Sequence, residues 1–157
     1  MPDAYQEGVR LLSRRSLTRR EVVLRLKERG YEDDDVEAAV SRLVAVSAID
    51  DAALARHWIG SQAAAAGRGR ERAVAQLVAR GVDGAVASSA WAEAVLDGAI
   101  VEDALLAKAV RRRLGPQPGR AGKARLARVY NALLHEGFGR EHVEAALAPY
   151  GFEGTDS

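Results

Sequence analysis

The histidines are the first residues in this sequence that could perform chemistry. His57 stands beside Trp58, and His135 and His142 are seven residues apart. A zinc pair on a helix requires histidines four residues apart and a third ligand, so this spacing does not predict a metal site. The chain has no cysteine, which excludes thiolate zinc sites and disulfides.

An acidic run, Asp33, Asp34 and Asp35, could suggest calcium. An EF-hand loop places acids at alternate positions around a central glycine, and this run has neither feature. We interpret the run, like the Asp50-Asp51 pair, as a helix start, where carboxylates satisfy free N–H groups and an Asp of the run caps the helix.

The segment Gly-Arg-Gly-Arg at 67–70 faintly resembles a phosphate loop. It lacks the Gly-Lys-Ser/Thr ending and follows a predicted helix, whereas a phosphate loop follows a strand. No Ser/His/Asp set or carboxylate pair has a spacing suited to catalysis. We therefore predict a protein that is not an enzyme and has no cofactor or metal.

Three groups of basic residues are the strongest candidates for binding. The candidate contact residues are Arg14, Arg15, Arg19, Arg20, Arg68, Arg70, Arg72, Arg111, Arg112, Arg113, Arg120, Lys123 and Arg125. The ordinary explanation is a solvated face. However, we expect these groups to flank helix starts, where each cation costs about 0.3–1 kcal/mol against the helix dipole. This placement predicts an anionic partner, phosphate or carboxylate, although a GC-rich coding bias would also favour arginine.

A repeated helix ending organises the elements that carry these residues. The pattern Leu-x-x-x-Gly followed by an apolar residue ends at Gly30, Gly81 and Gly137, at spacings of 51 and 56 residues. Glycine after an apolar helix is typical of a Schellman cap, because only glycine enters the left-handed conformation without a Cβ penalty. Three such caps predict an internal repeat.

The repeat predicts an all-α protein of nine helices in three helix-turn-helix-like units, forming an elongated, curved body. The expected units are 1–49, 50–97 and 98–157, the last with a frayed tail from 153. Alanine and leucine are abundant, as is typical of helices. In the first helix, 4–15, we expect Tyr5, Val9 and Leu12 to face inward. In the helix that begins near Gly69, we expect Val78 to be buried.

The chain also lacks the features of an exported or membrane protein. It contains no 18-residue apolar window and no apolar core of a signal peptide in its first 20 residues. We expect a cytoplasmic monomer. Net charge alternates in sign along the chain, from +5 over 5–30 to −6 over 31–53 and +7 over 105–142. A partner would therefore respond to local charge rather than to the total of +1.

Several stretches resemble the bacterial RecX regulatory proteins. They are LTRREVVLRLKERGY at 17–31, DDAALARHWI at 50–59, Gly67-Arg-Gly69, QLVARGV at 76–82 and GFGREHVEAAL at 137–147. The resemblance covers nearly the whole chain. It implies three tandem three-helix units and a modulator that lies in the groove of RecA filaments on single-stranded DNA. Such a modulator dampens ATP hydrolysis, strand exchange and repressor co-cleavage. Gln62 stands where the family usually has a basic residue, which argues against contact through that helix.

Two other functions fit the same residues. One is a stand-alone DNA-binding module that contacts single- or double-stranded phosphate backbones without RecA. The other is a helical scaffold for an acidic protein. The resemblance implies no catalytic residues, and it assigns contacts to basic regions rather than to single positions.

Overall fold

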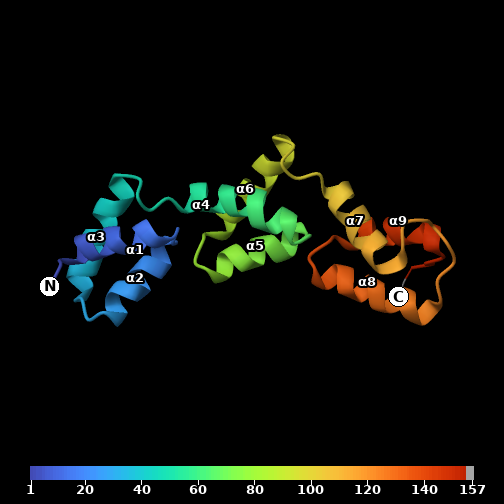
Figure 1. The fold of residues 1–157 in the computed structure, drawn as a ribbon, viewed down its shortest axis with the longest axis horizontal. Helices are drawn as coiled ribbons and strands as arrows, with labels where there is room; N and C mark the ends of the chain where they lie inside the picture. Colours follow the sequence, from blue (N-terminus) through green and yellow to red (C-terminus); the bar gives the residue numbers. More distant parts are fainter. Residues whose placement is uncertain (155–157) are drawn as a thin grey trace. The chain divides into compact units, whose positions relative to one another are not determined.

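The computed structural model describes residues 1–154, and every regular element among them is helical (Figure 1). A π-helical segment, Ile59–Ala63, continues α4, and a 3₁₀ turn, Ala148–Tyr150, follows α9. The α-helices are α1 Ala4–Arg14, α2 Arg19–Glu28, α3 Asp33–Ala45, α4 Asp51–Trp58, α5 Arg70–Ala79, α6 Gly84–Leu96, α7 Glu102–Leu114, α8 Lys123–His135 and α9 Arg140–Leu147. The all-α prediction is confirmed.

The described chain divides into two compact units. Unit 1 comprises residues 1–57 and 76–90, and the described part of unit 2 comprises residues 58–75 and 91–154. One apolar cluster in unit 1 spans Ala4 to Ile49, and one in unit 2 spans Leu106 to Tyr150. These clusters fall within the first and third predicted repeats. The boundaries of three repeats stay a prediction, and the end of the expected frayed tail, 155–157, lies outside the described residues.

The three glycine caps are confirmed. Gly30, Gly81 and Gly137 have φ of 89°, 102° and 95°. At each one, the following N–H donates to the carbonyl five residues before it, as Val82 does to Leu77 at 3.0 Å. The two bonds of a Schellman cap thus end α2, α5 and α8 in the same way.

The predicted inner face of α1 is correct in part: Tyr5 and Leu12 pack against the apolar cluster of unit 1, but Val9 does not face it. Val9 is 45% exposed, and the buried positions are Ala4, Glu7, Gly8 and Leu11. Gly8 sets this orientation, because a Cβ there would stand 2.6 Å from Leu43 Cδ1, so α1 approaches α3 along its glycine.

An ion pair with Arg29 keeps the buried Glu7 on that inner face. Glu7 is 3% exposed and accepts a hydrogen bond from Arg29, the residue before Gly30. A buried carboxylate requires such a partner, and the apolar periodicity of α1 gives no indication of it.

Two smaller predictions are also wrong. The N-cap of α3 is Glu32, which makes no side-chain cap bond, and Asp33–Asp35 occupy the first turn instead. Val78 is exposed, since the neighbouring Leu77 takes the inward position.

No helix in the described part of the chain is both long and apolar enough to cross a membrane.

Candidate protein and nucleic-acid interface

The first basic group lies at a junction inside unit 1, where the start of α2 meets the end of α5. Thr18 caps α2 by accepting from the Glu21 N–H at 3.2 Å, and its hydroxyl donates to the Arg80 carbonyl at 2.6 Å. Arg80 Nη2 in turn donates to Glu21 Oε1 at 2.8 Å. The N–H end of one helix therefore abuts the carbonyl end of another, an arrangement that the dipoles of both helices favour.

The contacts at this junction favour the ionised form of Glu21. Burial on its own would raise the pKa of Glu21, but hydrogen bonds from the Thr18 N–H and from Arg80 outweigh it. The pKa of this carboxyl therefore lies below its usual value, and the ionised form is favoured in the folded protein.

Arg20 also has a counterpart within the protein. Its Nη2 donates to the carbonyl of Ala79, the last residue of α5. Its Cβ lies 2.6 Å from the place that a Cβ on Gly81 would take. Because a carbonyl oxygen accepts a hydrogen bond from this guanidinium, Arg20 is less available to a partner than its sequence position suggests.

A second junction of the same kind lies inside unit 2, between the start of α5 and the end of α8. The Gly69 N–H donates to the Glu136 carbonyl at 2.7 Å, and the Glu71 N–H donates to the Gly137 carbonyl at 3.2 Å. A Cβ on Gly137 would stand 2.7 Å from Arg72 Cβ, and a Cβ on Gly69 would overlap the backbone of Gly137. Glycine at both positions is therefore required by close contact.

The second and third basic groups converge around Glu136 in unit 2. This carboxylate accepts from Arg113 and lies 4.0 Å from Arg112 Nη2. Arg112 Nη2 also lies 3.7 Å from the place of a Cβ on Gly67. Arg125 Nη2 donates to the Arg113 carbonyl at 2.8 Å. Arg112 of the third group thus lies beside Gly67, more than 40 positions earlier in the chain. We call the arginines of the second and third groups the basic region of unit 2.

Trp58 adds an aromatic ring to unit 2. The Arg68 guanidinium lies over this indole, 5.7 Å from its centroid, within the range of a cation–π interaction. Arg72, in the first turn of α5, is half-buried against the Gly137 turn.

Several predicted contact residues remain accessible. Among residues 1–154, six exposed side chains make no hydrogen bond or ion pair: Arg14, Arg19, Arg70, Arg111, Arg120 and Lys123. Arg15 makes only a long ion pair, 3.7 Å from Glu21. These side chains can reach a partner without breaking an internal bond.

The expected placement at helix starts is correct for part of the set only. Arg19 and Arg20 open α2, Arg70 opens α5 and Lys123 opens α8. The third group was expected to flank the start of α8, but Arg111–Arg113 form the last turn of α7, and Arg14 stands in the last turn of α1. Cations at helix ends are favoured by the dipole, so those four residues carry no electrostatic argument for an anionic partner.

The sequence analysis missed Arg80 and Glu136, which complete the two junctions. Each directly precedes a cap glycine, so the glycine repeat itself contains a usable signal. Because Arg80 is basic and Glu136 is acidic, a search for residues of one charge does not show that both occupy the position before a cap glycine.

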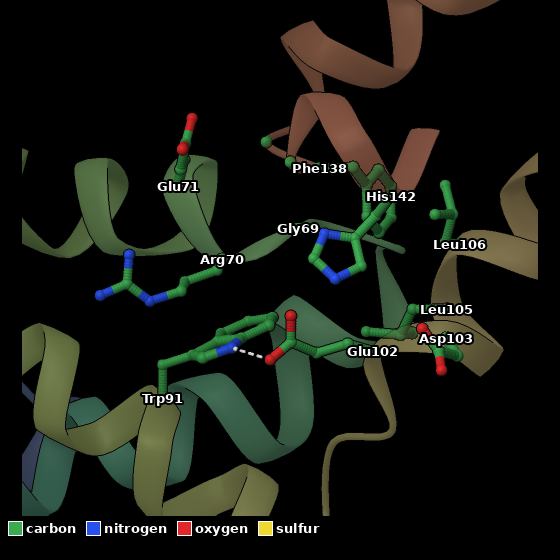
Figure 2. A pocket seen from close by; sticks show the side chains of 12 residues that line it. Gly69, Arg70, Glu71, Trp91, Glu102, Asp103, Leu105, Leu106, Phe138 and His142 are labelled. Carbon is green, nitrogen blue, oxygen red and sulfur yellow. Dashed lines mark hydrogen bonds between the residues drawn. The ribbon is translucent and has the colours of Figure 1, made fainter. Parts of the chain in front are cut away.

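A pocket of about 150 Å³ lies beside the second junction (Figure 2). Its lining comes from the first turns of α5, α7 and α9, with Trp91 of α6 on one side. Trp91 Nε1 donates to Glu102 Oε1 at 3.2 Å, the dashed line in Figure 2. His142 also borders the pocket, but no three potential ligands among the described residues are grouped to hold a metal.

Comparison with known sequences identifies relatives of this chain. Residues 4–43 match the family model described as RecX, first three-helix domain. The Regulatory protein RecX of Mycobacterium avium is 44% identical over 84 residues, 54% of this chain and 49% of that protein. In this match and in two others to mycobacterial proteins of the same name, the chain spans about half the length of the relative. The Thermobifida fusca protein of the same name is 32% identical over 147 residues, 87% of this chain and 77% of that protein.

Solved structures share the fold. The crystal structure of RecX from Lactobacillus salivarius matches with a TM-score of 0.72 at 18% identity, over 92% of each chain. A second crystal structure, of regulatory protein RecX, matches with a TM-score of 0.77 at 24% identity, over 92% of this chain and 70% of that one. Together with the long match to the Thermobifida fusca protein, these findings place the chain in the RecX family of regulatory proteins.

Proposed function

We propose that this protein binds RecA–single-stranded DNA filaments in the cytoplasm and inhibits or modulates RecA. Recombination, ATP hydrolysis and co-protease activity would all decrease, with effects on DNA repair and the SOS response. The relatives are named regulatory proteins, which supports control by binding rather than by catalysis.

The observation that carries the proposal is the basic region of unit 2. Arg112 lies beside Gly67, next to the second group in sequence, and is 53% exposed at its side chain. Arg70 and Arg111 are exposed and unpaired among the described residues. Guanidinium groups bind phosphate and carboxylate in a two-pronged manner, so such a region suits a filament made of DNA and protein.

Co-sedimentation with RecA–single-stranded DNA filaments, together with a RecA ATPase assay, tests the proposal. We expect the wild-type protein to pellet with filaments and to lower ATP hydrolysis. The double variant Arg70→Glu, Arg111→Glu should bind at least about tenfold more weakly, because like charges then face the filament. Lys108→Glu with Arg128→Glu makes the same charge change at other exposed positions and should bind as the wild type does.

A protein that neither pellets with filaments nor alters the ATPase would refute this function. A stand-alone DNA-binding module gives a different result, namely sub-micromolar affinity for bare DNA with a salt dependence equivalent to several phosphates. We expect weak binding to bare DNA and no preference among sequences.

A further inference from the structure

The pocket beside the second junction combines apolar walls with a negatively charged rim. Leu105, Leu106 and Phe138 line it together with the Trp91 indole. Its volume of about 150 Å³ is below the ~300–1,000 Å³ typical of small-molecule sites. One side chain fits this space, whereas a nucleotide or a drug-sized ligand does not.

The carboxylates on the rim are available to a ligand. Glu102 and Asp103 stand in the first turn of α7, and Glu71 stands in the first turn of α5. Glu102 accepts the Trp91 N–H, and the side chains of Asp103 and Glu71 have no polar partner among residues 1–154. Arg70 is the one arginine in the lining, so three carboxylates outnumber it.

Helix dipoles account for carboxylates at these two helix starts, but not for the aromatic-lined hollow between them. Long basic side chains pack their methylene stems on apolar surface and keep their charged heads at the edge. The pocket offers both features at once: apolar walls, with the buried Trp91 indole among them, and two carboxylates at its mouth, Asp103 and Glu71, that have no polar partner among the described residues.

We propose that this pocket receives one basic side chain, arginine or lysine, from a protein partner. Its stem lies against Leu105 and Phe138, and its head lies against Asp103 and Glu102. Because phosphate groups are repelled by this rim, the pocket binds the protein part of a filament, whereas the basic region of unit 2 suits DNA. This assignment of the two surfaces to protein and DNA rests on the proposed function. The binding of a basic side chain in the pocket does not depend on it.

A titration with a single amino-acid probe tests the site directly. In a Trp58→Phe protein, the indole N–H of Trp91 gives one side-chain signal in a proton–nitrogen spectrum. N-acetyl-arginine amide should shift this signal in a saturable way, and N-acetyl-citrulline amide, which has the same shape without the charge, should not. Asp103→Asn with Glu102→Gln should weaken the arginine response at least about tenfold. Equal responses to the two amides, or no saturable shift, would overturn the proposal.

Filament binding provides the second measurement. Asp103→Lys with Glu71→Lys should lower affinity for RecA–single-stranded DNA about tenfold or more, without weakening binding to bare single-stranded DNA. Glu37→Lys with Asp97→Lys is the charge-matched control at exposed positions away from the lining and should bind as the wild type does. If the pocket variant and the control variant bind filaments equally well, the pocket does not receive a basic side chain of the filament, but the proposed function is unaffected. If the wild type itself fails to bind filaments, the proposed function is wrong and the amide titration alone decides the pocket.

Discussion

Three glycine-to-alanine substitutions separate the two demands placed on the cap glycines. Gly30 has φ of 89° and nothing within 4 Å of an added Cβ, so it tests conformation alone. Gly69 has no left-handed φ, but its Cβ would stand 2.6 Å from the Phe138 nitrogen, so it tests contact alone. Gly137 combines a φ of 95° with an approach of 2.7 Å to Arg72 Cβ.

The expected losses of unfolding free energy follow from these geometries. Gly30→Ala should cost about 1–2 kcal/mol, the penalty of a left-handed non-glycine residue. Gly69→Ala should cost about 1–3 kcal/mol, the range for overpacking against atoms that cannot move aside. Gly137→Ala should cost roughly the sum of both, about 2–5 kcal/mol.

Urea unfolding followed by helical circular dichroism measures the overall losses. Amide hydrogen exchange at Glu71 reports on the junction itself. This N–H lies in the first turn of α5 and has no partner within the helix, so the Gly137 carbonyl at 3.2 Å is the acceptor that protects it. Exchange at Glu71 should accelerate in Gly69→Ala and Gly137→Ala and stay unchanged in Gly30→Ala.

If Gly137→Ala and Gly30→Ala lose the same stability, the start of α5 does not press on the Gly137 turn. Unchanged exchange at Glu71 in Gly69→Ala would have the same meaning. Either result would refute the contact between these two helix ends, although the caps themselves would stand.

Three further substitutions test single features of the two units. Ser47 has φ of 60° where the corresponding position of the next repeat is Gly98, so Ser47→Gly should raise stability by about 1 kcal/mol in urea unfolding. The pKa of Glu21 is lowered in the folded state, so the stability that this carboxylate contributes is present above the usual carboxyl range and is lost as pH falls through it. In thermal melts, the melting temperature of Glu21→Gln should therefore fall less on acidification than that of the wild type. An equal fall in both proteins would contradict this. Arg113→Ala should destabilise unit 2 by about 1–3 kcal/mol because it leaves the partly buried Glu136 carboxylate without its hydrogen bond. Arg111→Ala, at an exposed side chain that is unpaired among the described residues, should leave the melting temperature unchanged.

Local chemistry made much of the fold predictable. The spacing of Gly30, Gly81 and Gly137 identified three helix endings, because few residues other than glycine enter the left-handed region. The Thr18-x-x-Glu21 pattern is that of a capping box, and it marks the start of α2 in the sequence itself. Such features depend on residues a few positions apart, which the sequence displays directly.

Features set by distant residues were not predictable in the same way. The periodicity of α1 suggested Val9 as a core residue, whereas the fit of Gly8 against Leu43 turns the helix and exposes Val9. The meeting of Gly69 with Gly137 joins segments 68 positions apart, and no local pattern indicates which helix start meets which cap.

The junction in unit 1 has a consequence for the order in which the chain acquires its structure during synthesis. The apolar cluster from Ala4 to Ile49 is contiguous in sequence, so its residues leave the ribosome together. The segment 76–90, which supplies the acceptor for Thr18, emerges later, by roughly two to six seconds at ~5–20 residues per second. In that interval the nascent three-helix core presents an unmet Thr18 hydroxyl and an unmet Arg20 guanidinium. The contacts at the start of α2 are therefore complete only after the segment 76–90 has been synthesised.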